Sequence, residues 1–303
     1  MKTSMRYFAW VSALCLFPLC SSCINTLQDE DEENSSVNVQ CKDLTFKVKP
    51  YDQTPITKAT TISDFKVIDA ALYTYDNTNG YKIYQKITQN EGDEGFKTLN
   101  FASVNYGNYT LVVCGQTKTD HAVMDNPLAI TYPDNQVPQM QYYMQNLTVS
   151  ESSTPGGRIT TALGIARFAL TIKEVIPETV STIRLTVEGT STQFNAKEGL
   201  GVAPATQRVI SLNVISKRGL SDVTLGCYLW LLNEEETEAA STVKIIADAL
   251  DESGQVICTH TFDKVPLKRG YSTNYSGDFF DPAVGSITID YQTNYTGNID
   301  VEF

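Results

Sequence analysis

The sequence predicts an all-β protein with two sandwich domains, and three observations support this. Short runs in which every second residue is apolar recur along the chain, which is the period of a strand with one buried face. Strand-favouring residues are abundant, with 16 tyrosines among 303 residues. The best helical stretch, residues 233–240, allows one or two turns at most. Short, regularly spaced strands with little helix predict paired sheets packed face to face.

The first half opens with an isolated strand. In residues 44–48, Leu44, Phe46 and Val48 alternate with polar residues, and a loose segment with prolines and threonines follows. The run Asp-Asn-Thr-Asn-Gly at 76–80 predicts a turn that joins two strands into a hairpin. The strands expected after the loose segment are 65–75, 81–87, 99–101, 106–114 and 142–149, with a long connection at 116–139.

A linker divides the chain. Residues 151–157 lack apolar side chains and end in Pro-Gly-Gly, so they favour a boundary between domains. We therefore expect an N-terminal sandwich at 43–150 and a C-terminal sandwich at 158–303. The strands expected in the second sandwich are 160–175, 183–187, 209–215, 224–232, 243–250, 256–262, 286–291 and 298–303.

The N-terminus has the layout of a lipoprotein signal peptide. Two cations precede an apolar run at 7–19 that is too short to span a bilayer, and small residues follow it. The run Leu-Cys-Ser-Ser-Cys at 19–23 predicts cleavage after residue 22 and lipidation of Cys23. A plain signal peptide, with Cys23 as an ordinary thiol, is the alternative. Removal of residues 1–22 takes away two cations and no acid, so the net charge changes from −12 to −14.

Five consecutive acidic residues, 29–33, follow the lipidation site. One interpretation is a solvated tether, spanning 23–42, that like charges keep extended. The other is that the run resembles the acidic export signal of Bacteroidota lipoproteins displayed on the outer face of the outer membrane. An acidic chain without a basic cluster argues against nucleic acid as a partner.

Few residues suggest chemistry. The folded part contains Cys41, Cys114, Cys227 and Cys258, of which the last two could form a disulfide, although buried free thiols are the commoner outcome. The two histidines, 121 and 260, lie in different predicted domains, without a nucleophile nearby in the sequence. We expect no enzyme activity, no metal site and no cofactor.

Three segments resemble the fimbrillin and fimbrillin-associated anchor subunits of type V pili, which are Bacteroidota surface lipoproteins. They read YGNYTLVV at 106–113, ALGIARFALTIKEVIP at 162–177 and VPLKRGYSTNYSGDFF at 265–280. The resemblance implies two transthyretin-like β-sandwich domains and assembly into a surface fimbrium that serves adhesion. It also implies that a protease cuts after a basic residue and removes the first strand, whose groove a neighbouring subunit's strand then fills.

The cut would fall between Lys58 and Ala59, in the loose segment. The family's arginine is replaced by lysine, and no arginine occurs between Arg6 and Arg158. This departure leaves three possibilities open: a lysine-tolerant protease, an uncut anchor subunit, and an ordinary loop lysine. The last strand, 298–303, is either the donor or a plain strand of the second sandwich.

The resulting prediction is a structural or adhesive subunit, or the lipid anchor, of a fimbrium on the outer membrane. Its partners would be other fimbrial subunits and a ligand on a host or bacterial surface. The alternative is a surface lipoprotein that binds glycans, for which only Trp230 of the two tryptophans survives processing.

Overall fold

The computed structural model describes residues 40–50, 65–202, 204, 207–232, 241–280, 288–289 and 298–302. Cys23, Lys58, Ala59, the acidic run and the short helix expected at 233–240 lie outside these residues. The chain divides into Met1–Asn38 and Val39–Phe303, and the described residues all belong to the second unit. No helix within the described part is long and apolar enough to cross a membrane.

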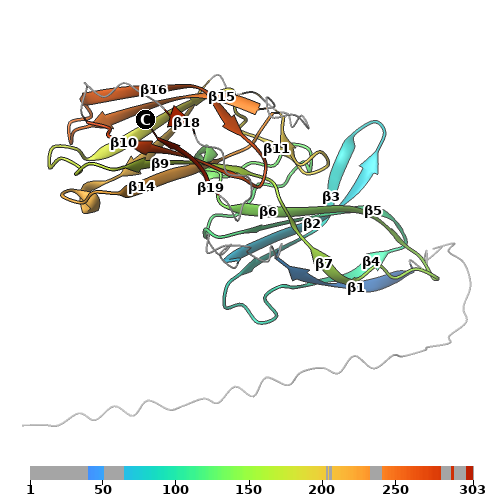
Figure 1. The fold of residues 1–303 in the computed structure, drawn as a ribbon. Helices are drawn as coiled ribbons and strands as arrows, with labels where there is room; N and C mark the ends of the chain where they lie inside the picture. Colours follow the sequence, from blue (N-terminus) through green and yellow to red (C-terminus); the bar gives the residue numbers. More distant parts are fainter. Residues whose placement is uncertain are drawn as a thin grey trace, which may run out of the picture. The chain divides into compact units, whose positions relative to one another are not determined.

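The first half forms two facing sheets (Figure 1). One has the order β4-β1-β7 and the other the order β3-β2-β5-β6-β8. A core of apolar side chains fills the space between them, with Leu44, Phe101 and Leu111 among its members. The strands are β1 (Cys41–Lys49), β2 (Val67–Asp76), β3 (Gly80–Asn90), β4 (Thr98–Asn105), β5 (Gly107–Gln116), β6 (Met140–Val149), β7 (Gly157–Thr160) and β8 (Ala162–Leu163).

The second half also has two main sheets. Their orders are β14-β9-β17-β19-β18 and β13-β10-β15-β16, and a second apolar core that includes Phe168, Leu185 and Phe262 joins them. Its strands are β9 (Ala166–Ile172), β10 (Thr182–Glu188), β13 (Arg208–Asn213), β14 (Val223–Leu229), β15 (Ser241–Leu250), β16 (Val256–Leu267), β17 (Ser272–Gly277), β18 (Thr288–Ile289) and β19 (Asn298–Glu302). A small ribbon pairs β11 (Phe194–Asn195) with β12 (Leu200–Gly201).

The two halves repeat one topology. If the seven main strands of each half are numbered in chain order, both halves have one sheet of order 4-1-7 and one of order 3-2-5-6. In both, strand 1 runs antiparallel to strand 4 and parallel to strand 7. The additions differ, since β8 extends the first half beyond β6, whereas β19 and β18 extend the second beyond β17. The predicted all-β sandwich fold is confirmed.

The burial of β5 confirms its predicted alternation. Leu111 and Val113 face the core between the two sheets of the first half, whereas Val112 and Cys114 face a separate cluster on the other side of the strand. That second cluster takes residues from the long connection, such as Tyr132, and from the second half, such as Trp230. Both faces of this antiparallel strand are therefore buried, which explains its almost continuous apolar sequence.

The turn at 76–80 is also confirmed. The Asp76 carboxylate accepts hydrogen bonds from the backbone N–H groups of Thr78 (2.7 Å) and Asn79 (2.9 Å). Gly80 has a φ of +72°, where glycine is favoured because it has no Cβ. The hairpin is therefore held by turn chemistry that a short-range pattern can predict.

β17 was not predicted, because its sequence, STNYSG, lacks alternating apolar residues. Its polar side chains are nevertheless buried and have hydrogen-bond partners. Ser272 donates its hydroxyl to the side-chain oxygen of Asn274, and Thr273 donates to the carbonyl of Pro266. Burial of polar groups is tolerated where hydrogen bonds replace those lost to water.

The strands after the linker pair with strands of the first half. β7 pairs with β1 and β8 with β6, so sheets of the first half continue to Leu163, beyond the linker at 151–157. The boundary between 43–150 and 158–303 remains a prediction.

The cysteines are free thiols, which is the outcome that the sequence favoured over a Cys227–Cys258 disulfide. Cys227 lies on β14 and Cys258 on β16, and all four described cysteines are free. Burial raises the pKa of the Cys227 thiol to about 11 and raises the pKa of Cys114 further. Cys41, by contrast, is exposed at the start of β1.

Alkylation of the native protein at pH 8 should therefore modify Cys41 first and leave Cys114 and Cys227 unmodified. A thiol with a pKa near 11 is about one-thousandth thiolate at that pH, and the thiolate is the reactive form. Peptide mapping by mass spectrometry would assign the label, and unfolding in denaturant should make all the thiols reactive. A linked peptide that contains Cys227 and Cys258 would contradict the structure.

Candidate functional site: the first strand and its groove

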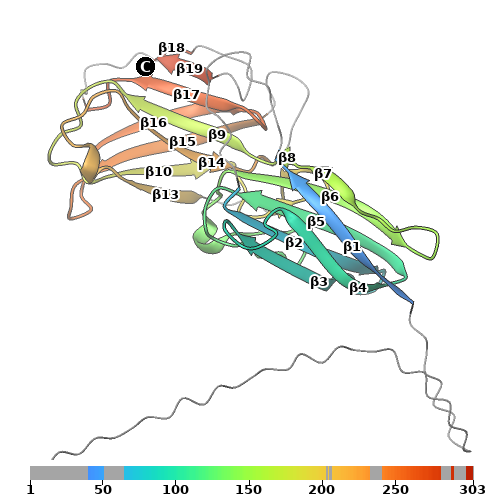
Figure 2. The ribbon, with the colours of Figure 1, turned by 90° about the horizontal axis from the view of Figure 1, so that it is seen from below.

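β1 is the middle strand of a three-stranded sheet (Figure 2). It pairs antiparallel with β4, with Phe46 opposite Leu99, and parallel with β7, with Phe46 opposite Gly157. Among the described strands, β4 and β7 have no other partner in that sheet. Without β1 the sheet would lose both of its pairings, and β4 and β7 would face each other across an empty groove.

The inner face of β1 fills this groove with three apolar side chains. Leu44, Phe46 and Val48 are buried to 0%, 1% and 5% exposure, and they belong to the core of the first half. The ring of Phe46 meets that of Phe101 edge to face, with centroids 6.4 Å apart. Ile159 of β7 belongs to the same core. The predicted alternation of residues 44–48 is confirmed, and it identifies the side chains that occupy the groove.

Polar contacts fix the register of β1 on the β4 side. The Asp43 carboxylate accepts a hydrogen bond from the Ser103 N–H at 2.7 Å, and Thr45 donates its hydroxyl to the side-chain oxygen of Asn100 at 3.0 Å. At the end of the strand, the Lys49 carbonyl accepts from the Thr161 N–H at 3.1 Å. Polar contacts therefore hold β1 on both sides of the groove, although its register with β4 shifts between Lys42 and Leu44.

Gly156 lies directly against β1. A Cβ on this residue would come within 2.9 Å of the Thr45 carbonyl oxygen, closer than real Cβ atoms are found. The sequence presented this glycine as part of a flexible linker, whereas the structure shows that it leaves room for the β1 backbone. The signal in the sequence is the short strand pattern that follows it at 158–160, where one apolar residue stands between two polar ones.

The two halves differ in how strand 1 is connected to strand 2. In the second half, β9 continues to β10 through residues 173–181, all of which the structure describes. In the first half, residues 50–66, which include Lys58 and Ala59, connect β1 to β2. Equivalent strands of one topology are therefore joined by a nine-residue connection in one half and by a longer, threonine-rich one in the other.

β19 occupies a similar setting in the second half. It runs parallel to β17 and antiparallel to β18, just as β1 runs parallel to β7 and antiparallel to β4. Its predicted range of 298–303 agrees with the strand found at Asn298–Glu302. The chain therefore has a strand near each end that is bordered by one parallel and one antiparallel neighbour.

The tryptophan considered for sugar binding is a core residue. Trp230 is 1% exposed, stacks on Phe194 with centroids 5.8 Å apart and donates its ring N–H toward the Met140 sulfur at 3.3 Å. It therefore provides no exposed platform for a sugar ring. Truncation of Trp230 would disturb packing, so it would not test glycan binding.

The histidines have structural partners. His121 Nδ1 lies 3.1 Å from the buried Asp69 carboxylate, which also accepts from the Ala122 N–H at 2.8 Å. His260 Nε2 lies 2.7 Å from the Phe279 carbonyl oxygen. In the part of the chain that the structure describes, no three histidine, cysteine, aspartate or glutamate side chains are placed to hold a metal ion.

Gly156→Ala should loosen β1 selectively. Overpacking against a backbone carbonyl typically costs about 1–3 kcal/mol, and here the strain falls on the pairing of β1 with the segment that leads into β7. Hydrogen exchange of the β1 amides should accelerate while exchange in β15 stays unchanged.

Gly107→Ala is the matched control, because its Cβ would meet neighbours only at ordinary distances of 3.5 Å or more. Equal exchange in the two variants would show that Gly156 does not support β1.

Comparisons with known proteins find similar solved structures but no matching family. No protein-family model and no curated protein matches the sequence. Among solved structures, a candidate adhesin from Bacteroides ovatus ATCC 8483 is similar, with a TM-score of 0.49 and 13% identity over 79% of this chain and 88% of that chain. A candidate cell adhesion protein from Bacteroides eggerthii DSM 20697 has a TM-score of 0.41 and 10% identity over 82% and 93% of the two chains. The fimbrial anchor protein Mfa2 from Porphyromonas gingivalis has a TM-score of 0.33 and 10% identity over 72% and 82%.

Proposed function

We propose that this protein is a lipid-anchored structural or adhesive subunit of a surface fimbrium, which assembles by strand exchange in the groove of β1 or serves as the fimbrial anchor. One observation carries the proposal. β1 is the middle strand of its sheet, and Lys58 lies between β1 and β2 in the sequence. A single cut there would leave β1 attached to the body by non-covalent contacts alone.

If β1 leaves, a groove filled by another strand has a lower free energy than an empty groove. Burial of a large apolar side chain contributes about 1.5–3 kcal/mol, and β1 places Leu44, Phe46 and Val48 in the core. Loss of the strand would also leave hydrogen-bonding groups of β4 and β7 unpaired. A segment from another chain that supplies both a backbone ladder and alternating apolar residues would restore these contacts.

The strand predicted at 298–303 is a candidate donor that fits this requirement. In its sequence Ile299, Val301 and Phe303 alternate with polar residues, which gives three apolar residues at the spacing that Leu44, Phe46 and Val48 have in β1. A strand already flanked by one parallel and one antiparallel neighbour in its own sheet matches the polarity of the groove.

The sequence of the N-terminal segment supports a position on the cell surface. Lipidation at Cys23 would hold it in the outer membrane, and the acidic run at 29–33 would direct it to the cell surface. Its partners would be other fimbrial subunits, and a host or bacterial surface would be the adhesion target. In this proposal the protein is not an enzyme and needs no cofactor.

Whether the subunit polymerises or anchors depends on the cut at Lys58. Incubation of the mature protein with a trypsin-like protease should yield a core that starts near Ala59, followed by multimers that resist SDS. Lys58→Gln is the control and should remain monomeric with β1 in place. If the cut protein stays monomeric, and protein taken from cells retains a lipidated N-terminus at Cys23, the polymerising role fails and the anchor role is supported.

Val301→Asp tests the donor strand. A carboxylate in an apolar groove is strongly disfavoured, so we expect the cut variant to form few or no multimers. Asp300→Asn, a change at the neighbouring polar position, should assemble normally.

A plain last strand of the second sandwich would behave differently. In that case Val301→Asp would lower the melting temperature of the uncut monomer and leave assembly of the folded fraction intact. Size-exclusion chromatography and a thermal melt of both variants separate the two roles.

A further inference from the structure

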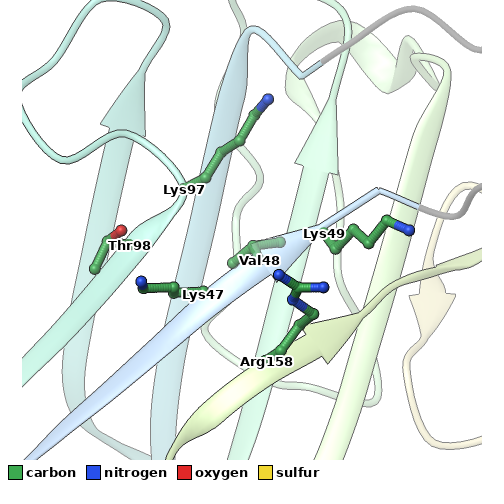
Figure 3. Close-up of a pocket in the computed structure, with 6 residues that line it drawn as sticks. All are labelled: Lys47, Val48, Lys49, Lys97, Thr98 and Arg158. Atoms are coloured by element: carbon green, nitrogen blue, oxygen red, sulfur yellow. The ribbon is translucent and has the colours of Figure 1, made fainter.

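The outer face of the β1 sheet contains a basic pocket. Lys47, Lys49, Lys97 and Arg158 line it together with Val48 and Thr98, and its volume is about 330 Å³. The cations come from β1, from the loop before β4 and from β7. In Figure 3 the guanidinium of Arg158 lies along β1, between the side chains of Lys47 and Lys49. None of the described residues that line it is acidic, although the whole chain has a net charge of −12.

Pairing of the strands places two of these cations side by side. Lys47 of β1 is the direct partner of Arg158 on β7, so both side chains project from the same face of the sheet, and both are exposed. No ion pair or hydrogen bond of either side chain is found among the described residues. Like charges directly opposite each other on neighbouring strands destabilise a sheet. The arrangement therefore has a cost that a bound anion would remove.

The second half has a different pairing where its strand 7 begins. There, strand 1 is β9 and strand 7 is β17, and Arg167 of β9 is the direct partner of Ser272. Arg167 donates a hydrogen bond to the Ser272 hydroxyl at 3.0 Å. The same topology therefore pairs a cation with a neutral acceptor in one half and with a second cation in the other. The fold itself does not require the basic pair.

We infer that this pocket binds a small oxyanion with more than one negative charge, of the phosphate or diphosphate type. The planar fork of Arg158 suits two oxygens of such a group, and the lysine ammonium groups supply further charge-assisted hydrogen bonds. Four cationic side chains line the pocket, so a ligand with more than one negative charge neutralises them better than a carboxylate does. The net negative charge of the whole chain would repel a long polyanion. The ligand is therefore a compact group, either free or on a lipid headgroup.

Such a ligand would stabilise β1 in its sheet. It would bridge Lys47 and Lys49 of β1 to Arg158 of β7, and it would lose those contacts if β1 left. Any ligand that binds only the state with β1 in place stabilises that state. This consequence for assembly rests on the function proposed above, whereas the binding site does not.

Titration calorimetry of the full chain with inorganic pyrophosphate tests the site. We expect Lys47→Gln/Arg158→Gln to weaken binding about tenfold or more, since each tenfold corresponds to about 1.4 kcal/mol and two charge-assisted contacts are lost. The matched control is Lys82→Gln/Lys86→Gln, which removes the same charge from exposed positions on β3 and should bind like the parent. If the parent does not bind pyrophosphate, or if the two double variants lose the same affinity, pyrophosphate is not a ligand of this site. The site is then overturned unless the vesicle experiment below detects binding.

A second experiment distinguishes a free anion from a lipid headgroup. Flotation with phosphatidylcholine vesicles, with and without phosphatidic acid, detects recognition of a phosphate headgroup. Binding of the parent to doped vesicles, lost in Lys47→Gln/Arg158→Gln and kept in the control, would support the site with a lipid ligand. Failure of both pyrophosphate and doped vesicles would overturn the inference.

Lys47→Glu tests the charge argument independently of any ligand. It should form an ion pair with Arg158, raise the melting temperature without pyrophosphate and abolish pyrophosphate binding. A fall in melting temperature would contradict the repulsion between Lys47 and Arg158.

Hydrogen exchange tests whether pyrophosphate stabilises β1 in its sheet. Pyrophosphate should slow exchange of the β1 amides in the parent and have no such effect in Lys47→Gln/Arg158→Gln. If exchange of the β1 amides in the parent is unchanged at saturating pyrophosphate, the ligand does not stabilise β1. Failure of the cut protein to form multimers would count against the proposed function and leave the binding result unaffected.

Discussion

The two-sided pairing of β1 is the constraint on which the first half depends. β4 and β7 are brought together only through this strand, and the core of the half is closed by its three apolar side chains. The second half solves the same packing problem with β9, which a short described connection joins to β10. The halves therefore share a topology and differ in the length of the connection that follows strand 1.

The two faces of β1 have separate physical roles. The inner face gives affinity for the groove, because Leu44, Phe46 and Val48 are removed from water. The outer face gives little burial and instead brings Lys47 next to Arg158. A strand that is held by apolar contacts on one side and opposed by like charges on the other is sensitive to its ionic surroundings.

Strand periodicity predicted most of the fold, and its failures have physical causes. The faces of β5 and the turn at 76–80 followed from local patterns, because alternation and turn chemistry depend on neighbouring residues. β17 was missed because hydrogen bonds, which a local pattern does not reveal, satisfy its buried polar side chains. Trp230 was considered for a surface site, yet packing against Phe194 and Tyr132 buries it. The Cys227–Cys258 disulfide was the less favoured alternative, and all four described cysteines are free.

The sequence by itself determined that the chain is all-β, that a separate strand precedes the body and that this strand has one apolar face. It also supplied the candidate lipidation site Cys23 and the candidate cut after Lys58. Only the tertiary structure decided that β1 lies between β4 and β7, that Gly156 makes room for it and that Lys47 lies beside Arg158. The physical reason is that alternation along a strand is local, whereas the partner and the register of a strand depend on segments far away in the chain.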